Sequence, residues 1–120
     1  MRALLSAEIT VQEALERVRF SELRTWLVTD RRGVIGVTNL PTLEREAAEG
    51  AVKLLGELVG KGGFPHVHPD QGLDLVLERM GANEIEVLPV VSRADVHKLE
   101  GILTLRDVLD SYGVRPRDRA

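Results

Sequence analysis

The sequence contains no cysteine, which excludes disulfides and thiolate chemistry. Aromatic residues make up only 3% of the 120 residues. The core therefore has to be aliphatic, and the stacking platforms that bind single-stranded nucleic acid are lacking. The net charge of −3 argues against non-specific binding to polyanions. We expect no nucleic-acid partner.

Long apolar runs are also missing. No run reaches the roughly 18 residues that cross a bilayer, and no signal peptide is visible. We therefore expect a cytoplasmic protein without direct membrane insertion. The sequence has no G-x-S-x-G motif, no phosphate-binding loop with lysine, and no histidine beside an acid. We predict that the chain is not an enzyme and has no catalytic residues.

The most informative feature that is present is an internal repeat. The stretch Thr10–Val18 returns in similar form as Gly72–Met80. Each copy leads to an apolar run and then, after a polar turn, to a second apolar run with a central glycine. These runs are Trp26–Val28 and Val34–Val37 in the first copy, and Val87–Val91 and Leu99–Leu103 in the second. One short unit cannot bury its apolar face alone, so the second copy supplies the missing wall.

The repeat predicts an α+β fold of two pseudo-symmetric units, each with an extended lead, a helix, two strands and a second helix. Thr10 and Glu13 form a capping-box pattern at the start of the first helix. Gly81 is expected to end the first helix of the second unit. Pro89 has no N–H, so its strand should lie at a sheet edge or carry a bulge.

The predicted units are residues 1–50 and residues 51–113, followed by a frayed tail at 114–120. The second unit has a lead of about twenty residues, 51–70, whereas the lead of the first is much shorter. We expect that part of the first lead is missing or is supplied by upstream sequence. The alternative is a naturally short N-terminus.

Two stretches of the second copy carry a family resemblance. Leu88–Val91 and Gly101–Leu109 resemble the motifs of a tandem pair of CBS domains. The second copy is a close match and the first is degraded. The resemblance implies two units packed through their sheets, with a cleft that holds ATP, ADP or AMP as a regulatory ligand. No cofactor is required.

A narrower resemblance covers His66–Met80 and Leu88–Arg93. These stretches are similar to the C-terminal cytosolic CBS pair of bacterial ClC-type chloride channels and transporters. This resemblance implies an upstream membrane transport domain in the same polypeptide, a role in ion transport, and a place at the cytosolic face of a membrane.

Candidate ligand contacts lie at the last strand-to-helix junction. The resemblance implies that Thr104, beside Leu103, contacts phosphate or ribose and that Asp107 contacts ribose. The alternative is that Thr104 and Asp107 form a capping box and bind no ligand. The aligned residues of the first copy are Asn39 and Thr42. The first copy therefore lacks the carboxylate that would contact ribose, so we expect at most one bound nucleotide.

The adenine walls implied by the ClC-type resemblance come from the first copy. They are Leu4, Leu5, Leu23, Arg24 and Val28. No aromatic residue stands at position 23 or 24 to stack on a base. Aliphatic packing and backbone contacts would have to replace it.

The histidines of the sequence do not predict a metal site. His66 and His68 are two residues apart in an extended segment, so their side chains should point to opposite faces. His97 lies in a loop with no obvious carboxylate partner. A polar linker is preferred over a metal site, and we predict none.

The expected partner is a second copy of the chain. Helices of CBS pairs commonly form the contact between pairs, and the apolar candidates here are Leu73, Leu77, Met80, Leu105 and Leu109. The alternative is that all five fill the internal core. Three functions stay open: a nucleotide-sensing regulatory module, a ligand-free dimerisation module, and a stand-alone metabolic sensor.

Overall fold

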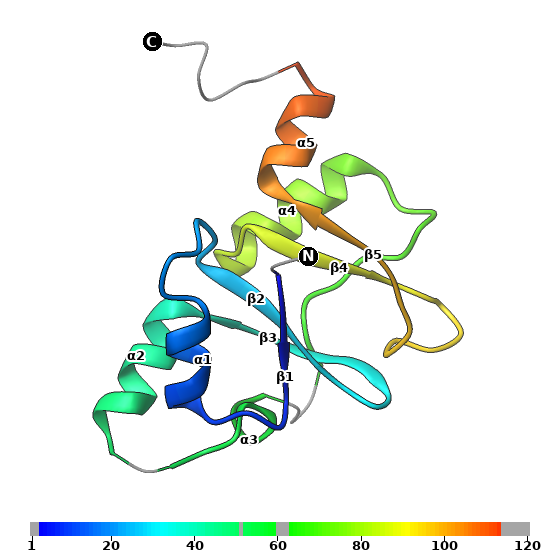
Figure 1. Ribbon diagram of the computed structural model, residues 1–120. Helices are drawn as coiled ribbons and strands as arrows, with labels where there is room; N and C mark the ends of the chain where they lie inside the picture. The colour runs from blue at the N-terminus through cyan, green and yellow to red at the C-terminus, as the bar shows by residue number, and fades with distance from the viewer. Residues whose placement is uncertain (1–2, 51, 60–62, 114–120) are drawn as a thin grey trace, which may run out of the picture.

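The computed structural model describes residues 3–50, 52–59 and 63–113 (Figure 1). The predicted tail at 114–120 lies outside the described residues. The elements, in chain order, are β1 (Leu4–Ser6), α1 (Val11–Arg17), β2 (Thr25–Asp30), β3 (Gly33–Asn39), α2 (Leu40–Ala48), α3 (Leu55–Leu58), α4 (Leu73–Asn83), β4 (Val87–Val91), β5 (Leu99–Thr104) and α5 (Leu105–Ser111). Within those ranges, no helix has the length and apolar character that crossing a bilayer requires.

Two small sheets form, one from each copy of the repeat. The first has the order β1-β2-β3, with β1 parallel and β3 antiparallel to β2. The second pairs β4 with β5 antiparallel, and an isolated parallel bridge between Val67 and Val90 stands where β1 stands in the first. The predicted α+β fold of two similar units is confirmed.

The helix starts follow the sequence signals. Thr10 accepts a hydrogen bond from the Glu13 N–H at 3.0 Å, and the Glu13 carboxylate accepts one from the Thr10 N–H at 2.8 Å. This capping box satisfies two N–H groups that α1 leaves without helical partners. Asn39 caps α2 by accepting from the Thr42 N–H at 2.9 Å.

One predicted helix end is wrong. α4 continues through Gly81 to Asn83, and Glu84 follows in the left-handed region with φ of 55°. The Ile85 N–H donates to the Met80 carbonyl at 3.0 Å. Such a closure brings an apolar residue back onto the helix. Burial of Ile85, which is 9% exposed, offsets the roughly 1 kcal/mol cost of a helical glycine.

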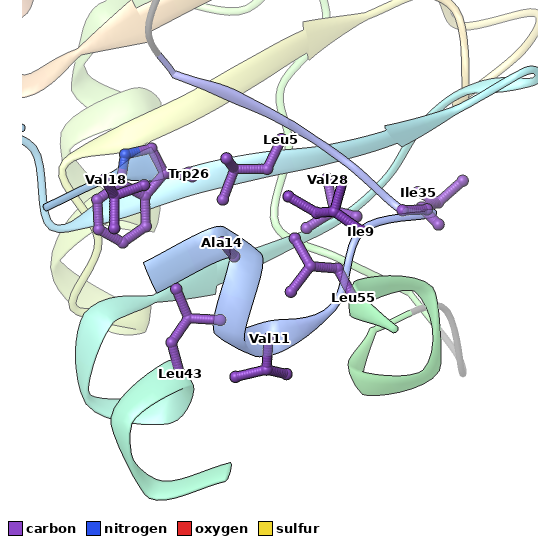
Figure 2. Packing of buried hydrophobic residues seen from close by; sticks show 11 residues of the cluster. Leu5, Ile9, Val11, Ala14, Val18, Trp26, Val28, Ile35, Leu43 and Leu55 are labelled. Atoms are coloured by element: carbon purple, nitrogen blue, oxygen red, sulfur yellow. The ribbon is translucent and has the colours of Figure 1, made fainter. Parts of the chain in front are cut away.

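The first core lies between the first sheet and helices α1, α2 and α3 (Figure 2). Strand alternation divides the side chains of β2, because successive residues point to opposite faces. Trp26 and Val28 enter this core, whereas Leu27 faces the second sheet. All three side chains are fully buried.

The segment around α3 packs on the first unit, although the repeat places it in the lead of the second. The Val11 N–H donates to the Lys53 carbonyl, and the Leu55 and Gly56 N–H groups donate to the carbonyls of Ile9 and Ala7, each at 2.9 Å. Leu55 is fully buried in the first core. Leu55 therefore adds an apolar side chain to the core of the first unit. The division at residues 50 and 51 stays a prediction.

The two sheets pack against each other through a third apolar cluster. Its buried members are Ala3, Leu27, Val34, Val87 and Val91. The register of β4 and β5 shifts between Val90 and Val91, just after Pro89, and β4 has only β5 as a full strand neighbour among the described residues. The bulge expected of a strand that contains proline is therefore present, whereas the Val67 bridge occupies the other side of β4.

The tip of the first hairpin is held by a loop of the second unit. The Val34 N–H donates to the His97 carbonyl at 2.9 Å, and His97 Nδ1 donates to the Val34 carbonyl at 2.9 Å. Gly33 has φ of 124°, and a Cβ at that position would overlap the His97 carbonyl oxygen. Only glycine fits this approach.

Candidate functional site: two clefts between the units

Two hydrogen bonds repeat the same arrangement in both units. The Leu40 N–H donates to the Arg24 carbonyl at 2.9 Å, and the Leu105 N–H donates to the Glu86 carbonyl at 2.7 Å. Each bond joins the start of the unit's second helix to the residue that precedes its first long strand. The backbone N–H of Arg24 also donates to the Glu86 carboxylate. The two strand-entry residues therefore meet where the units adjoin.

A cleft lies on each side of this contact. The first, which we call the Thr104 cleft, has a volume of about 540 Å³ and is lined by Phe20–Leu23, Glu86 and Thr104–Arg106. The second, the Asn39 cleft, has about 410 Å³ and is lined by Arg24, Thr25, Asn39, Pro41 and residues 83–86. Both volumes fall in the range of small-molecule sites, roughly 300–1,000 Å³.

Each cleft takes one wall from each unit. The Thr104 cleft combines the α1–β2 loop of the first unit with the β5–α5 junction of the second. The Asn39 cleft combines the α4–β4 loop of the second unit with the β3–α2 junction of the first. A ligand in either cleft would touch both units, so its binding would depend on how they are placed.

Thr104 and Asp107 satisfy each other in the structure. The Asp107 N–H donates to Thr104 Oγ1 at 3.1 Å, and the Thr104 N–H donates to the Asp107 carboxylate at 3.4 Å. The capping-box alternative is therefore present at this junction. Thr104 lines its cleft, whereas Asp107 is exposed and is not among the residues lining either cleft.

The predicted adenine walls are only partly brought together. Leu23 is half-buried and lines the Thr104 cleft with Thr104. Arg24 is exposed and lines the Asn39 cleft instead. The alternation of side chains along a strand could not assign Leu23 and Arg24 to a cleft, because both residues lie in a loop that turns between the two clefts.

Four other predicted contacts lie outside both clefts. Leu5 and Val28 are register partners, 6% and 0% exposed, and belong to the first core, between the first sheet and α1 (Figure 2). Leu103 packs against the core of the second unit. Leu4 is on the surface at 38% exposure. Burial of Leu5 and Val28 against α1 leaves them no route to a ligand in the clefts.

The sequence prediction missed Phe20. Its side chain is 90% exposed, and it lines the Thr104 cleft across from Thr104 and Arg106. The guanidinium of Arg19 lies 5.5 Å from the Phe20 ring centroid. The repeat contains a signal for it, since the corresponding residue of the second copy is Ala82. An apolar ring that the fold leaves uncovered is available to a planar ligand.

The predicted orientation of His66 and His68 is wrong. Their ring centroids are 5.0 Å apart, and both side chains line one cavity of about 560 Å³ outside the two clefts. The expectation of opposite faces assumed a regular strand. Only Val67 makes a β-bridge in this segment, so the flanking residues are not held to strand alternation.

Comparison with known proteins identifies the fold. Residues 57–113 match the family model of the CBS domain. The CBS domain pair of protein MJ0100, solved with 5′-methylthioadenosine and S-adenosyl-L-methionine, is 20% identical, with 94% of each chain covered and a TM-score of 0.68. A signal-transduction protein with CBS domains from Burkholderia ambifaria MC40-6 is 18% identical, with 98% of this chain and 84% of that chain covered and a TM-score of 0.69.

A third similar structure comes from a membrane protein. The cytosolic domain of the Mg²⁺ channel MgtE, solved with ATP, is 27% identical, with 91% of this chain and 44% of that chain covered and a TM-score of 0.64. No match to a curated protein is found. The chain has the fold of a CBS domain pair, and its second unit contains the stretch that matches the family model.

Proposed function

We propose that this CBS domain pair is a regulatory module that binds an adenosine-containing ligand in the Thr104 cleft. The observation that carries the proposal is the composition of that cleft. It places an exposed aromatic ring, Phe20, and a guanidinium, Arg106, on walls that belong to different units. Similar structures have been solved with S-adenosyl-L-methionine, 5′-methylthioadenosine and ATP.

The chemistry of the walls suits such a ligand. Phe20 offers a face for a purine ring, and Leu23 adds an aliphatic surface beside it. Arg106 offers paired donors to a phosphate or carboxylate. Asp107 lies one helical turn beyond Thr104, and its carboxylate would have to leave the Thr104 N–H to reach a ribose.

Binding across two units provides a regulatory output. A ligand shifts a conformational equilibrium only by its different affinity for the two arrangements. Because one wall of the cleft comes from each unit, a bound ligand favours the placement in which both walls contact it. We propose that this change acts on a transport domain of the same polypeptide, of the ClC type that the sequence resembles.

Isothermal titration calorimetry tests the ligand. ATP, AMP, S-adenosyl-L-methionine and 5′-methylthioadenosine are each titrated into the wild-type chain. We expect saturable binding of one ligand per chain, weakened roughly fivefold or more in Phe20→Ala, because base stacking on an aromatic ring contributes about 1–3 kcal/mol. The control is Thr42→Ala, which changes a residue outside the lining of the Thr104 cleft. Flat titrations at millimolar ligand would refute the proposal.

A ligand-free dimerisation module is the second candidate. It is favoured by the closed capping box of Thr104 and Asp107, which needs no ligand. Of the five apolar helix residues predicted at a dimer contact, Met80 is buried in the second core and Leu73 and Leu77 pack against it, whereas Leu105 is 36% exposed. Sedimentation equilibrium decides this candidate. A dimer whose stability ignores nucleotides would support it, and a monomer at all concentrations would exclude it.

A further inference from the structure

We propose that His66 and His68 form a binding site for a divalent transition-metal ion such as Zn²⁺, separate from both clefts. The two imidazoles lie side by side, with ring centroids 5.0 Å apart and ring planes inclined at 72°. Both side chains are half-buried and line the same cavity of about 560 Å³.

The hydrogen bonds of the two rings determine which nitrogen can bind a metal. His66 Nδ1 is 2.8 Å from the Phe64 carbonyl oxygen, and His68 Nδ1 is 2.9 Å from the Val91 carbonyl oxygen. A carbonyl oxygen only accepts, so each Nδ1 must carry the hydrogen. In each neutral ring the lone pair is therefore on Nε2. Histidines that bind metals are typically held in this way, with the other ring N–H donated to a carbonyl or carboxylate.

The spacing of the rings agrees with one shared ion. Two imidazoles that bind a tetrahedral zinc through Nε2, with zinc–nitrogen distances of about 2.0–2.1 Å, have ring centroids roughly 5 Å apart. The observed separation has that value. The described residues contain no cluster of three or more histidine, aspartate or glutamate ligands. The remaining coordination positions would therefore be taken by water, which leaves this site with fewer protein ligands than the three or four that zinc sites usually have.

The charges around the cavity set the strength of the site. Arg79 and Arg93 line it, and their positive charge opposes a bare cation. The charge of Arg93 is paired with the Asp70 carboxylate, whereas Arg79 donates to the neutral His66 carbonyl and keeps its full charge. The carboxylate of Glu78 lines the same cavity and offsets part of this charge. We therefore expect a site weaker than a structural zinc site with four protein ligands.

The chain contains three histidines, which allows a matched experiment. Asparagine places an N–H donor near the position of Nδ1 but has no atom at Nε2. The variants His66→Asn and His68→Asn therefore keep the bonds to the carbonyls and remove only the metal-binding nitrogen. His97→Asn is the control, because His97 Nδ1 bonds to the Val34 carbonyl in the same way and lies outside the cavity.

Zn²⁺ is titrated calorimetrically into the untagged chain and its variants at neutral pH in a buffer that does not bind metals. We expect one saturable site, roughly tenfold or more weaker in His66→Asn and in His68→Asn, and unchanged in His97→Asn. Thermal unfolding without metal shows whether each variant is folded.

Nitrogen chemical shifts distinguish metal binding by the two histidines from a purely structural role. Saturation with Zn²⁺ should shift the Nε2 resonances of His66 and His68 and leave that of His97 in place. The proposal is overturned by the absence of saturable zinc binding, by equal affinity of wild type and both cavity variants, or by a zinc shift at Nδ1 of these two rings.

Discussion

The Thr104 cleft and the Asn39 cleft share one backbone plan and differ in their side chains. Beside each cleft, the first N–H of a helix donates to the carbonyl of the residue before a strand, at 2.7 Å for the Thr104 cleft and 2.9 Å for the Asn39 cleft. Where the first has Thr104 and Arg106, the second has Asn39 and Pro41. The exposed ring of Phe20 corresponds to Ala82 in the other copy. The two clefts therefore share a backbone scaffold but present different side chains to a ligand.

The largest expected effect comes from the contact that holds the two units together. Gly33→Ala would drive a Cβ into the His97 carbonyl oxygen at a φ of 124°. We expect a loss of about 3 kcal/mol or more of unfolding free energy, since positive-φ strain and overpacking each cost roughly 1–3 kcal/mol. Urea denaturation measures this loss of unfolding free energy.

Gly50→Ala is the control for Gly33→Ala. Gly50 has φ of 81°, but no atom lies within 4 Å of a Cβ placed there. This variant isolates the backbone strain from the steric clash. If both variants lose the same free energy, the contact with His97 does not constrain the hairpin tip.

A second pair of variants compares corresponding strands of the two units. A Cβ at Gly36 would lie 2.5 Å from the Val59 Cβ, whereas the nearest atom to a Cβ at Gly101 is 3.8 Å away. We expect Gly36→Ala to cost roughly 1–3 kcal/mol. Gly101→Ala should be neutral or stabilise by up to about 1 kcal/mol, because alanine restricts the unfolded chain. If denaturation curves give both variants the same change in unfolding free energy, the close packing of Val59 against Gly36 does not distinguish the two sheets.

Exchanging the junction residues tests whether the clefts differ in recognition alone. Asparagine is at least as good a helix N-cap as threonine, so Thr104→Asn should change stability by less than about 0.5 kcal/mol. The reciprocal change Asn39→Thr should be equally mild. If Thr104 contacts the ligand, only Thr104→Asn should weaken nucleotide binding in calorimetry. Equal weakening by both changes would mean that recognition does not reside in the Thr104 cleft.

The smallest effects are expected from two exposed ion pairs. Arg93 donates to Asp70 across the second unit, and Arg32 donates to Asp30 within one turn of the first. These hydrogen bonds lower the pKa of Asp70 and of Asp30. A lowered folded-state pKa stabilises the protein above the unfolded pKa, and this contribution is lost as pH falls through the folded value.

Asp70→Asn should therefore destabilise slightly near neutral pH and have no effect in acid, below the folded pKa of Asp70. Both side chains are largely exposed, so added salt should remove most of the difference. Thermal unfolding from neutral to acidic pH checks the sign. A destabilisation that grows on acidification would contradict it.

Local patterns in the sequence predicted the elements well, because local bonds determine them. The capping box of Thr10 and Glu13 needs only residues three apart. The same holds for Thr104 and Asp107, where the cap was the alternative to a ligand contact. Gly81 misled the prediction, because the closure of α4 depends on the burial of Ile85 against the rest of the second unit.

The candidate site was harder to predict, because its neighbours come from different units. Leu23 and Thr104 meet in one cleft as expected, but Val28 turns into the first core. Phe20 was missed, because the exposed fraction of its side chain, 90%, depends on the tertiary packing. His66 and His68 met because a single bridge at Val67 does not impose strand alternation on the residues beside it.

The sequence by itself determined the repeat, the order of helices and strands, and the caps, since each of these depends on residues close together in the chain. Only the tertiary structure decided which face of each strand became core and which loops met to form the clefts and the histidine pair. The physical reason is that these contacts join the two units, and the burial of Leu27, Val34, Val87 and Val91 between the sheets sets how the units lie together.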